Sequence, residues 1–271
     1  MKAFHITAQT DGSSIARPLP LPVLHRKGEA PAEFFRQQAS GAIPRADLNL
    51  SPTRFIRRIR LDDGAVRNLA GGDGALLTFV IAGRLTLAGA LGEPLSLESG
   101  DLFLMDAAVA GALDATAAGG CLLVQSGVDA SWPGPEAQAL DAGTIVPRAS
   151  DGPNIKRVLK DDDDRAYFVD FPELFGTAPA NMWADTRSLT GLRFMSWEDG
   201  FLDWHPEVIN CLAIVLAGEL ELETRGRDGG IEIFRAGDIC MAEDRTGEGH
   251  IDRTRGVMQV ALFVFADDLT W

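Results

Sequence analysis

Short stretches in which apolar and polar residues alternate recur along the chain. In residues 83–87 (GRLTL) and 218–223 (GELELE) leucine occupies every second position, and the residues between are mostly polar. A period of two buries one face of a β-sheet and leaves the other face in water. Helical periodicity is scarce, and residues 31–40 are the best short candidate for a helix. The pattern predicts an all-β fold with many short strands and turns.

The strand pattern occurs twice. Residues 79–87 (FVIAGRLTL) return at 214–222 (IVLAGELEL), displaced by 135 residues, and 97–105 (LESGDLFLM) return at 234–242 (FRAGDICMA), displaced by 137. Two matches in the same order predict a duplicated domain, with Gly83 and Gly218 at equivalent turns. We attribute the two-residue difference to a longer hairpin loop in the second copy, residues 224–230, because extra residues cost least in a turn.

A segment rich in proline separates the two copies. Residues 133–155 contain Pro133, Pro135, Pro147 and Pro153 among glycine, serine and aspartate. The sequence therefore predicts an N-terminal domain over residues 1–145, with an N-terminal extension, and a C-terminal domain over residues 146–271. The acidic run 161–164 follows the join, and we interpret it as a solvated turn. Four adjacent carboxylates lack the alternating spacing of a calcium-binding loop.

Composition narrows the possible partners. The 271 residues are 46% hydrophobic, enough for a sizeable core, and carry a net charge of −14. An acidic surface repels phosphate backbones and anionic lipid, so we expect no nucleic-acid and no membrane partner. The longest apolar runs are too short to span a bilayer, and residues 1–10 do not resemble a secretory signal. The three cysteines (Cys121, Cys211 and Cys240) show no CxxC spacing, which favours a reducing, cytoplasmic compartment.

Four motifs carry a resemblance to a known family. They are V-L-A-G-E at 215–219, G-D at 237–238, D-W-H-P at 203–206 and A-E-D-R-T-G-E-G-H at 242–250. The chain resembles the cupin superfamily in its two-domain form, the bicupins, over residues 54–128 and 156–265. Its second half resembles a bacterial subgroup with D-W-H and E-D-T-T-G-x-G-H signatures. The resemblance implies two antiparallel jelly-roll β-barrels in one chain.

The resemblance also implies where a metal would bind. A typical metal-binding cupin supplies two histidines and a carboxylate from its first motif and a third histidine from its second. Counted back from Gly83 at the family's spacing, the first copy holds only leucine, alanine and glycine at these positions, at Leu69, Ala70, Gly71, Gly72 and Leu76. We therefore expect no metal in the first barrel and a largely apolar interior.

The second copy retains part of the ligand set. Counted back from Gly218, the two histidine positions hold His205 and Glu207, and the glutamate position holds Cys211. The second motif supplies His250, thirteen residues after Gly237. The candidate metal site therefore comprises His205 and His250, completed by Glu207, Cys211 or Glu243, and such ligands suit Fe, Mn, Ni or Zn. Trp204 and Glu243 are candidates for substrate contact.

Each of these residues has a structural alternative. His205 and His250 can instead make ordinary hydrogen bonds in the wall, and Cys211 can be a small buried apolar residue. Glu243 can brace its loop, and Trp204 can be a rim aromatic. On these alternatives the second barrel holds no metal.

Three functions remain open from the sequence. The first is a metal-assisted enzyme acting on a small molecule in the C-terminal barrel, with Glu207 or Glu243 moving protons. The second is a non-catalytic small-molecule binder, and the third is a structural bicupin whose barrels serve assembly. The two halves are expected to share an internal interface, and a homodimer is a candidate for the assembly.

Overall fold

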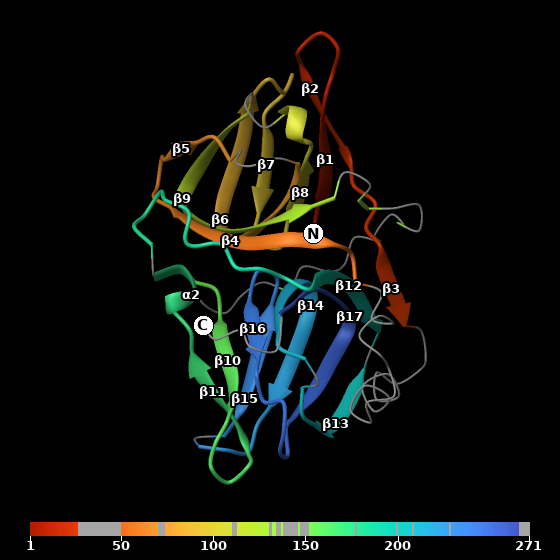
Figure 1. Cartoon of the computed structure of the whole chain (residues 1–271), viewed down its shortest axis with the longest axis vertical. Helices are drawn as coiled ribbons and strands as arrows, with labels where there is room; N and C mark the ends of the chain where they lie inside the picture. The colour runs from red at the N-terminus through yellow and green to blue at the C-terminus, as the bar shows by residue number, and fades with distance from the viewer. Residues whose placement is uncertain are drawn as a thin grey trace. The chain divides into compact units, whose positions relative to one another are not determined.

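A computed structural model of the chain describes residues 1–26, 50–69, 74–109, 113–129, 132–133, 137, 146, 152–176, 178–198, 200–207, 209–227 and 229–265 (Figure 1). The predicted helix at 31–40 and most of the predicted join at 133–155 lie outside these residues. Within them, no helix is long and apolar enough to cross a membrane. The backbone forms two compact units, composed of residues 1–22, 52–142 and 172–188, and of residues 23–51, 143–171 and 189–271.

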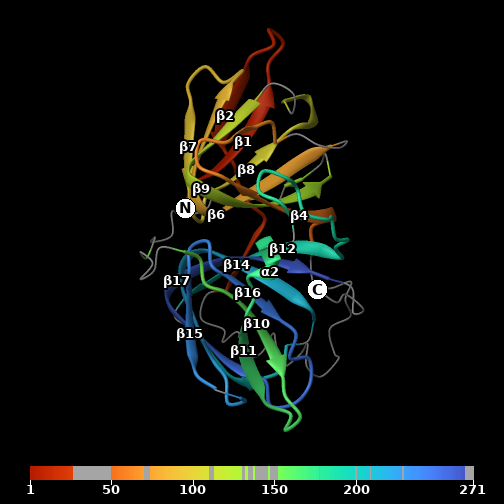
Figure 2. The same ribbon diagram turned by 90° about the vertical axis from the view of Figure 1, so that its left-hand side faces the viewer.

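Unit 1 is built on one eight-stranded sheet. Its strands follow the order β2-β1-β8-β6-β9-β4, with β5 paired to β9 and β7 paired to β6. All pairs are antiparallel except the parallel pair of β1 and β8, which lie side by side in Figure 2. The bounds are β1 Ala3–Ala8, β2 Ser14–Pro18, β4 Thr53–Leu61, β5 Val66–Arg67, β6 Ala75–Gly89, β7 Leu95–Glu98, β8 Leu102–Met105 and β9 Leu113–Val128. A short 3-10 turn, η2 (Ala107–Val109), follows β8, and α2 (Glu173–Gly176) also belongs to this unit.

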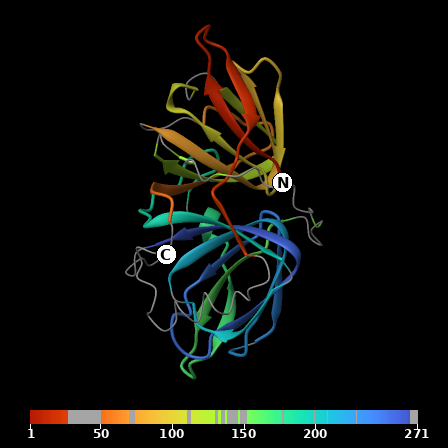
Figure 3. The same ribbon diagram turned by 90° about the vertical axis from the view of Figure 1, so that its right-hand side faces the viewer.

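Unit 2 is built on a nine-stranded sheet. Its order is β11-β10-β16-β14-β17-β12-β3, with β13 paired to β17 and β15 paired to β14. The long strands β14 and β17 curve around one wall of this unit (Figure 3). The bounds are β3 Val23–Arg26, β10 Ile155–Lys160, β11 Ala166–Asp170, β12 Gly191–Glu198, β13 Phe201–His205, β14 Cys211–Glu223, β15 Ile231–Arg235, β16 Ile239–Ala242 and β17 His250–Val264.

The two sheets repeat one topology, which confirms the predicted all-β duplication. In each, a hairpin pairs in parallel with a short strand, followed by two long strands and a further strand, β4 or β12, and in unit 2 β3 then continues the sheet. The glycines of the repeat occupy equivalent positions, but they are not at turns. Gly83 and Gly218 lie inside β6 and β14, where the register shifts at a bulge, with φ of 82° and 75°. Glycine suits this backbone, because a Cβ would lie 1.9 Å and 2.4 Å from the carbonyl oxygens of Gly120 and Val257.

The loop of the second hairpin is not longer than that of the first, so the prediction of a longer loop is wrong. The pairs Leu87–Leu95 and Glu223–Ile231 close the two hairpins, each over seven residues, so the loop 224–230 is not longer. The second hairpin instead has five cross-strand pairs where the first has four. The additional pair extends the alternating segment 218–223 by one position and adds ladder contacts that a longer loop would not provide.

The structure confirms that the acidic run 161–164 is a turn. Residues 161–164 connect β10 and β11, and the side chains of 162–164 are exposed. The Asp161 carboxylate accepts the backbone N–H groups of Asp163 and Arg165, each at 3.0 Å.

The compact units do not divide the chain at one point. Strand β3, from the N-terminal half, extends the sheet of unit 2 by pairing with β12. Residues 172–188, from the C-terminal half, belong to unit 1, where Trp183 bridges Ile59 and Arg187 bridges Ile56 on β4. An edge strand exposes unpaired N–H and C=O groups, and these two segments cover the edges formed by β4 and β12. The boundary predicted at residues 145–146 lies between the two repeated halves of the sequence and stays a prediction. Each compact unit also includes a segment from the other half.

Candidate metal and ligand site

Unit 2 contains a cavity on the inner face of its sheet. The cavity encloses about 710 Å³ of space outside atoms, the opening to solvent included. Its wall is mainly apolar, formed by leucine, isoleucine, valine, alanine, methionine and tryptophan side chains. The polar and thiol side chains on the wall are Arg193, Glu207, Cys211, Cys240, His250 and Asp252. The chemistry of the cavity therefore depends on a small group of residues.

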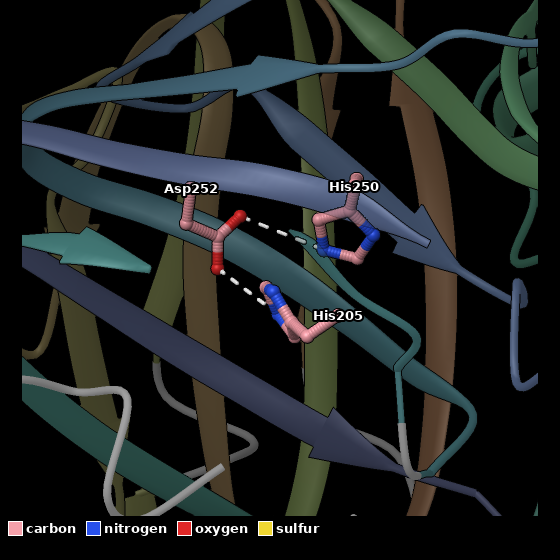
Figure 4. A group of neighbouring side chains, drawn as sticks. All are labelled: His205, His250 and Asp252. Carbon is pink, nitrogen blue, oxygen red and sulfur yellow. Dashed lines mark ion pairs between the residues drawn. The ribbon is translucent and has the colours of Figure 1, made fainter. Parts of the chain in front are cut away.

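Two histidines meet where β13 ends and β17 begins. His205 and His250 are cross-strand partners, and their ring centroids lie 4.6 Å apart at an interplanar angle of 56°. Asp252 follows His250 by two positions on β17, so its side chain is on the same face. All three residues are buried, and their potential ligand atoms lie within 4.8 Å of one another. Figure 4 shows the two imidazoles facing the two carboxylate oxygens of Asp252. We call these three residues the His-His-Asp group.

Each imidazole is held through its Nδ1 atom. His205 Nδ1 lies 2.9 Å from the carbonyl oxygen of Asp203, and His250 Nδ1 lies 2.6 Å from Oδ2 of Asp244, whose side chain has no exposed surface. Both partners are acceptors, so Nδ1 carries the proton and Nε2 is directed to Asp252. This is the way second-layer groups orient histidines that bind metals.

The Nε2 atoms face Asp252 without hydrogen bonding to it. His250 Nε2 is 3.5 Å from Oδ1, and His205 Nε2 is 3.7 Å from Oδ2. Hydrogen bonds of this kind are about 2.7–3.2 Å long. Two ligands about 2.1 Å from a metal lie about 3.4 Å apart at a tetrahedral angle, close to the observed spacing. Asp252 Oδ1 is buried and accepts no hydrogen bond within the described residues. The donor types, spacing and unsatisfied oxygen all fit a metal ion.

The two histidines differ in basicity. Burial alone would lower the pKa of His250, but the Asp244 carboxylate, with further contributions from Asp252 and Glu207, raises it to about 10. Burial lowers the pKa of His205, and the nearby Asp252 only partly offsets this effect. In the metal-free protein His250 is therefore an imidazolium between two carboxylates, and a metal ion would replace its Nε2 proton.

Glu207 and Cys211, which were predicted as metal ligands, line the cavity but are not part of the His-His-Asp group. Burial raises the pKa of the Cys211 and Cys240 thiols well above their usual value, and nearby carboxylates, Glu207 among them, raise it further. Both cysteines are therefore neutral thiols on the wall of the metal-free cavity.

The other two predicted residues lie elsewhere. Glu243 forms a two-pronged ion pair with Arg157, at 2.6 Å and 2.9 Å, and is not among the cavity-lining residues. The Trp204 ring lies under the Arg225 guanidinium, at 3.8 Å from carbon to centroid. Neither side chain is among the residues that line the cavity, and their contact with a substrate stays a prediction.

Asp252 was missed by the sequence reasoning, which searched only the positions of the family's ligands. The signal was available: in the segment 250–252 (H-I-D), a period of two on a strand places the first and third residues on one face.

The glycines of the signature allow the close approach of the two histidines. Gly247 and Gly249 have φ of 94° and 76°. A Cβ on Gly249 would lie 1.8 Å from the carbonyl oxygen of His205, so only glycine lets the start of β17 pass the end of β13 at this distance.

Unit 1 has apolar residues at the equivalent positions. Leu87 and Leu222 occupy the same place in the repeat, and they pair with Ala115 and Asp252. Ala115 thus corresponds to Asp252, and Leu113, two positions earlier, corresponds to His250. Both residues are buried in the apolar core of unit 1. The two units therefore share a framework but differ in the chemistry of their interiors.

Comparisons with known proteins place these observations in context. No family model and no curated protein matches the sequence. Solved structures do match it, and the three described here are 13–15% identical to it in sequence. A cupin 2 conserved barrel domain protein from Leptotrichia buccalis is 15% identical, with 80% of this chain and 85% of that chain covered, at a TM-score of 0.39. A protein of unknown function from Pseudomonas syringae is 13% identical, with coverages of 97% and 100% and a TM-score of 0.38. A mutant of the Bacillus subtilis oxalate decarboxylase is 15% identical, with coverages of 80% and 70% and a TM-score of 0.29.

The deciding observation is the shared topology of the two sheets, with a glycine at the bulge and a G-D step at the same place in both. Gly100 and Gly237 precede β8 and β16 with φ of 86° and 84°, as Gly83 and Gly218 precede the hairpins. The chain has the fold of a bicupin. Within this fold the candidate chemistry lies in unit 2.

Proposed function

We propose that the second cupin unit binds one divalent first-row transition metal at the His-His-Asp group and acts on a small molecule in the adjoining cavity. One observation carries the proposal. Two imidazole Nε2 atoms and a carboxylate face one another in a buried site, at distances too long for hydrogen bonds. Each imidazole is oriented by an oxygen acceptor at its Nδ1 atom.

The donor set supports this chemistry. Two histidines and one carboxylate leave coordination positions open, as in many iron and zinc enzymes. When bound, such an ion polarises an oxygen of the substrate or lowers the pKa of a water molecule.

The residues of the chain supply the remaining functions. Asp203 and Asp244 hold the imidazoles in the orientation that presents Nε2. The apolar wall excludes water and strengthens polar interactions at the group. Glu207 lines the cavity outside the His-His-Asp group, so it is the carboxylate available to exchange a proton with a bound molecule.

The proposal predicts the metal content of the purified protein. We expect about one transition-metal ion per chain in protein purified without added metal, and loss of this ion in H205A, H250A and D252N, because each removes one of three ligands. Elemental analysis by mass spectrometry measures this directly. H250A leaves the Asp244 carboxylate buried without its partner and is expected to destabilise the fold as well. D252N is therefore the variant expected to destabilise the fold least.

His5 provides a matched control. Its Nε2 lies 2.7 Å from the Asp106 carboxylate in unit 1, so H5A removes a histidine–aspartate pair outside the site. We expect H5A to retain the metal. Wild-type protein that contains no metal, and whose melting temperature does not change with Fe(II), Mn(II), Ni(II) or Zn(II), would contradict the proposal and favour a metal-free binder or a structural bicupin.

A further inference from the structure

Three loops of unit 2 meet beside the segments that carry the two histidines. They are the turn between β10 and β11, the loop between β14 and β15, and the loop between β16 and β17, which leads into His250. In the second loop, the backbone N–H of Gly226 donates to the carbonyl oxygen of Ala166 at 2.6 Å. In the third loop, the N–H of Glu248 donates to the carbonyl oxygen of Asp164 at 2.8 Å. The β10–β11 hairpin therefore binds both of the other loops.

The side chain of Arg225, in the β14–β15 loop, contacts both histidine-bearing segments. Its guanidinium lies over the Trp204 ring, 3.8 Å from carbon to centroid, and its Nη1 donates to Oε1 of Glu248 at 2.9 Å. Trp204 directly precedes His205 on β13. Glu248 precedes His250, the first residue of β17, by two positions. One arginine thus connects the end of β13 to the start of β17.

The ladder between these two strands is irregular at the same point. The register shifts between Leu202 and His205, just before His205 pairs with His250. Such an irregularity interrupts the ladder hydrogen bonds that would otherwise fix the spacing of the strands. Trp204 lies on the opposite face of β13 from His205, because successive side chains of a strand alternate. Arg225 therefore braces the interrupted ladder from the face that does not line the cavity.

We propose that Arg225 is a positioning residue for the His-His-Asp group: by binding Trp204 and Glu248 at once, it fixes the spacing of the two imidazoles. The negative face of a tryptophan ring attracts the guanidinium. The side chains of Arg225 and Glu248 are 52% and 35% exposed, so their ion pair alone contributes little stability. The effect is therefore expected mainly on the geometry of the site. This inference rests on the proposed function for its metal readout, but the two segments can also be followed without metal.

Arg227 provides a matched control from the same loop. Its guanidinium lies over the Tyr167 ring, 5.6 Å from the centroid, and its backbone N–H donates to the Asp161 carboxylate at 3.3 Å. Both partners belong to the β10–β11 hairpin. R227Q therefore removes a cation–ring contact of this loop and leaves the connection between β13 and β17 in place.

The experiment measures Zn(II) affinity by chelator competition and the visible absorption of the Co(II)-loaded protein, which reports the arrangement of the ligands. We expect R225Q to change the Co(II) spectrum and to weaken Zn(II) binding by about 3–10-fold, because an exposed cation–ring contact and an exposed ion pair are lost together. R225K should recover most of the affinity, because an ammonium group also binds a ring face and a carboxylate. R227Q should bind Zn(II) as the wild type does.

E248Q tests whether the two contacts of Arg225 act as a unit. Glutamine removes the ion pair, so E248Q alone should lose less affinity than R225Q. The double variant R225Q/E248Q should lose no more than R225Q, because residues that act through one another have non-additive effects. A double variant that loses the product of the two single losses would overturn the shared role.

Hydrogen exchange of the metal-free protein, followed by mass spectrometry, tests the positioning without metal. R225Q should exchange faster than the wild type in peptides that cover 201–205 and 248–254, and R227Q should not. If the wild type binds no metal but shows this difference, only the metal proposal is refuted. If the wild type binds metal, this inference alone is overturned by unchanged affinity or unchanged exchange in R225Q, by equal losses in R225Q and R227Q, or by no recovery in R225K. Melting temperatures identify a misfolded R225Q, and E248Q, which removes one contact only, then decides.

Discussion

Replacing Gly249 by alanine is expected to abolish metal binding and to destabilise unit 2 by more than about 3 kcal/mol. The positive φ alone costs a non-glycine residue about 1–3 kcal/mol. The added Cβ would also overlap the carbonyl oxygen of His205, at 1.8 Å, so β13 and β17 must separate where the two histidines pair. Thermal unfolding and elemental analysis of G249A measure the two effects.

Gly256 provides the control for the backbone term. It also lies on β17 with a positive φ of 69°, but a Cβ there would meet no atom within 4 Å. We expect G256A to cost about 1–2 kcal/mol and to retain the metal. If G249A and G256A behaved alike, the approach of β17 to β13 would not determine the geometry of the His-His-Asp group.

Replacing Asp244 by asparagine is expected to weaken metal binding by about 10–100-fold. The carboxylate holds His250 through a 2.6 Å hydrogen bond and makes the imidazole a better donor, and partners of metal-bound histidines typically contribute this much. Asparagine has a similar shape but no charge, so the variant tests the electrostatic role of Asp244. Competition with a chelator of known affinity measures the change.

Asp203 offers a matched comparison. The atom that holds His205 is the backbone carbonyl of Asp203, while the side chain accepts the N–H of Trp204. D203N removes a carboxylate near the group and leaves the hydrogen bond to His205 in place. We expect nearly unchanged metal affinity in D203N, and equal losses in D203N and D244N would indicate an effect of net charge rather than of orientation.

Much of the fold could be predicted from the sequence, because its determinants are local. Alternating leucines specify strands, and the repeated glycines mark backbone positions that other residues adopt poorly. What could not be predicted is how the backbone uses these positions. A glycine with positive φ serves a turn or a bulge equally well, so Gly83 and Gly218 were assigned to turns and lie in bulges.

The site was harder to predict, because its composition depends on register. His205 and His250 were identified from motif spacing, and the structure pairs them. Asp252 escaped because no family position corresponds to it, and its contribution depends on the pairing of β13 with β17. Glu243 precedes Asp244, so it is directed to the other side of the chain, where it meets Arg157. Two neighbouring residues thus have different roles: Asp244 orients His250, whereas Glu243 lies outside the set of cavity-lining residues.

The exchange of segments between the halves has a consequence for the order of folding during synthesis. The edge of β4 is covered by residues 183–187, which leave the ribosome only after most of the chain has been made. Strand β3 is made early but must wait for β12, near residue 194. Neither sheet can be completed from one half alone, so the halves cannot fold one after the other like independent domains. Contacts over such long sequence separations slow folding, and each open edge remains exposed to aggregation until its segment arrives.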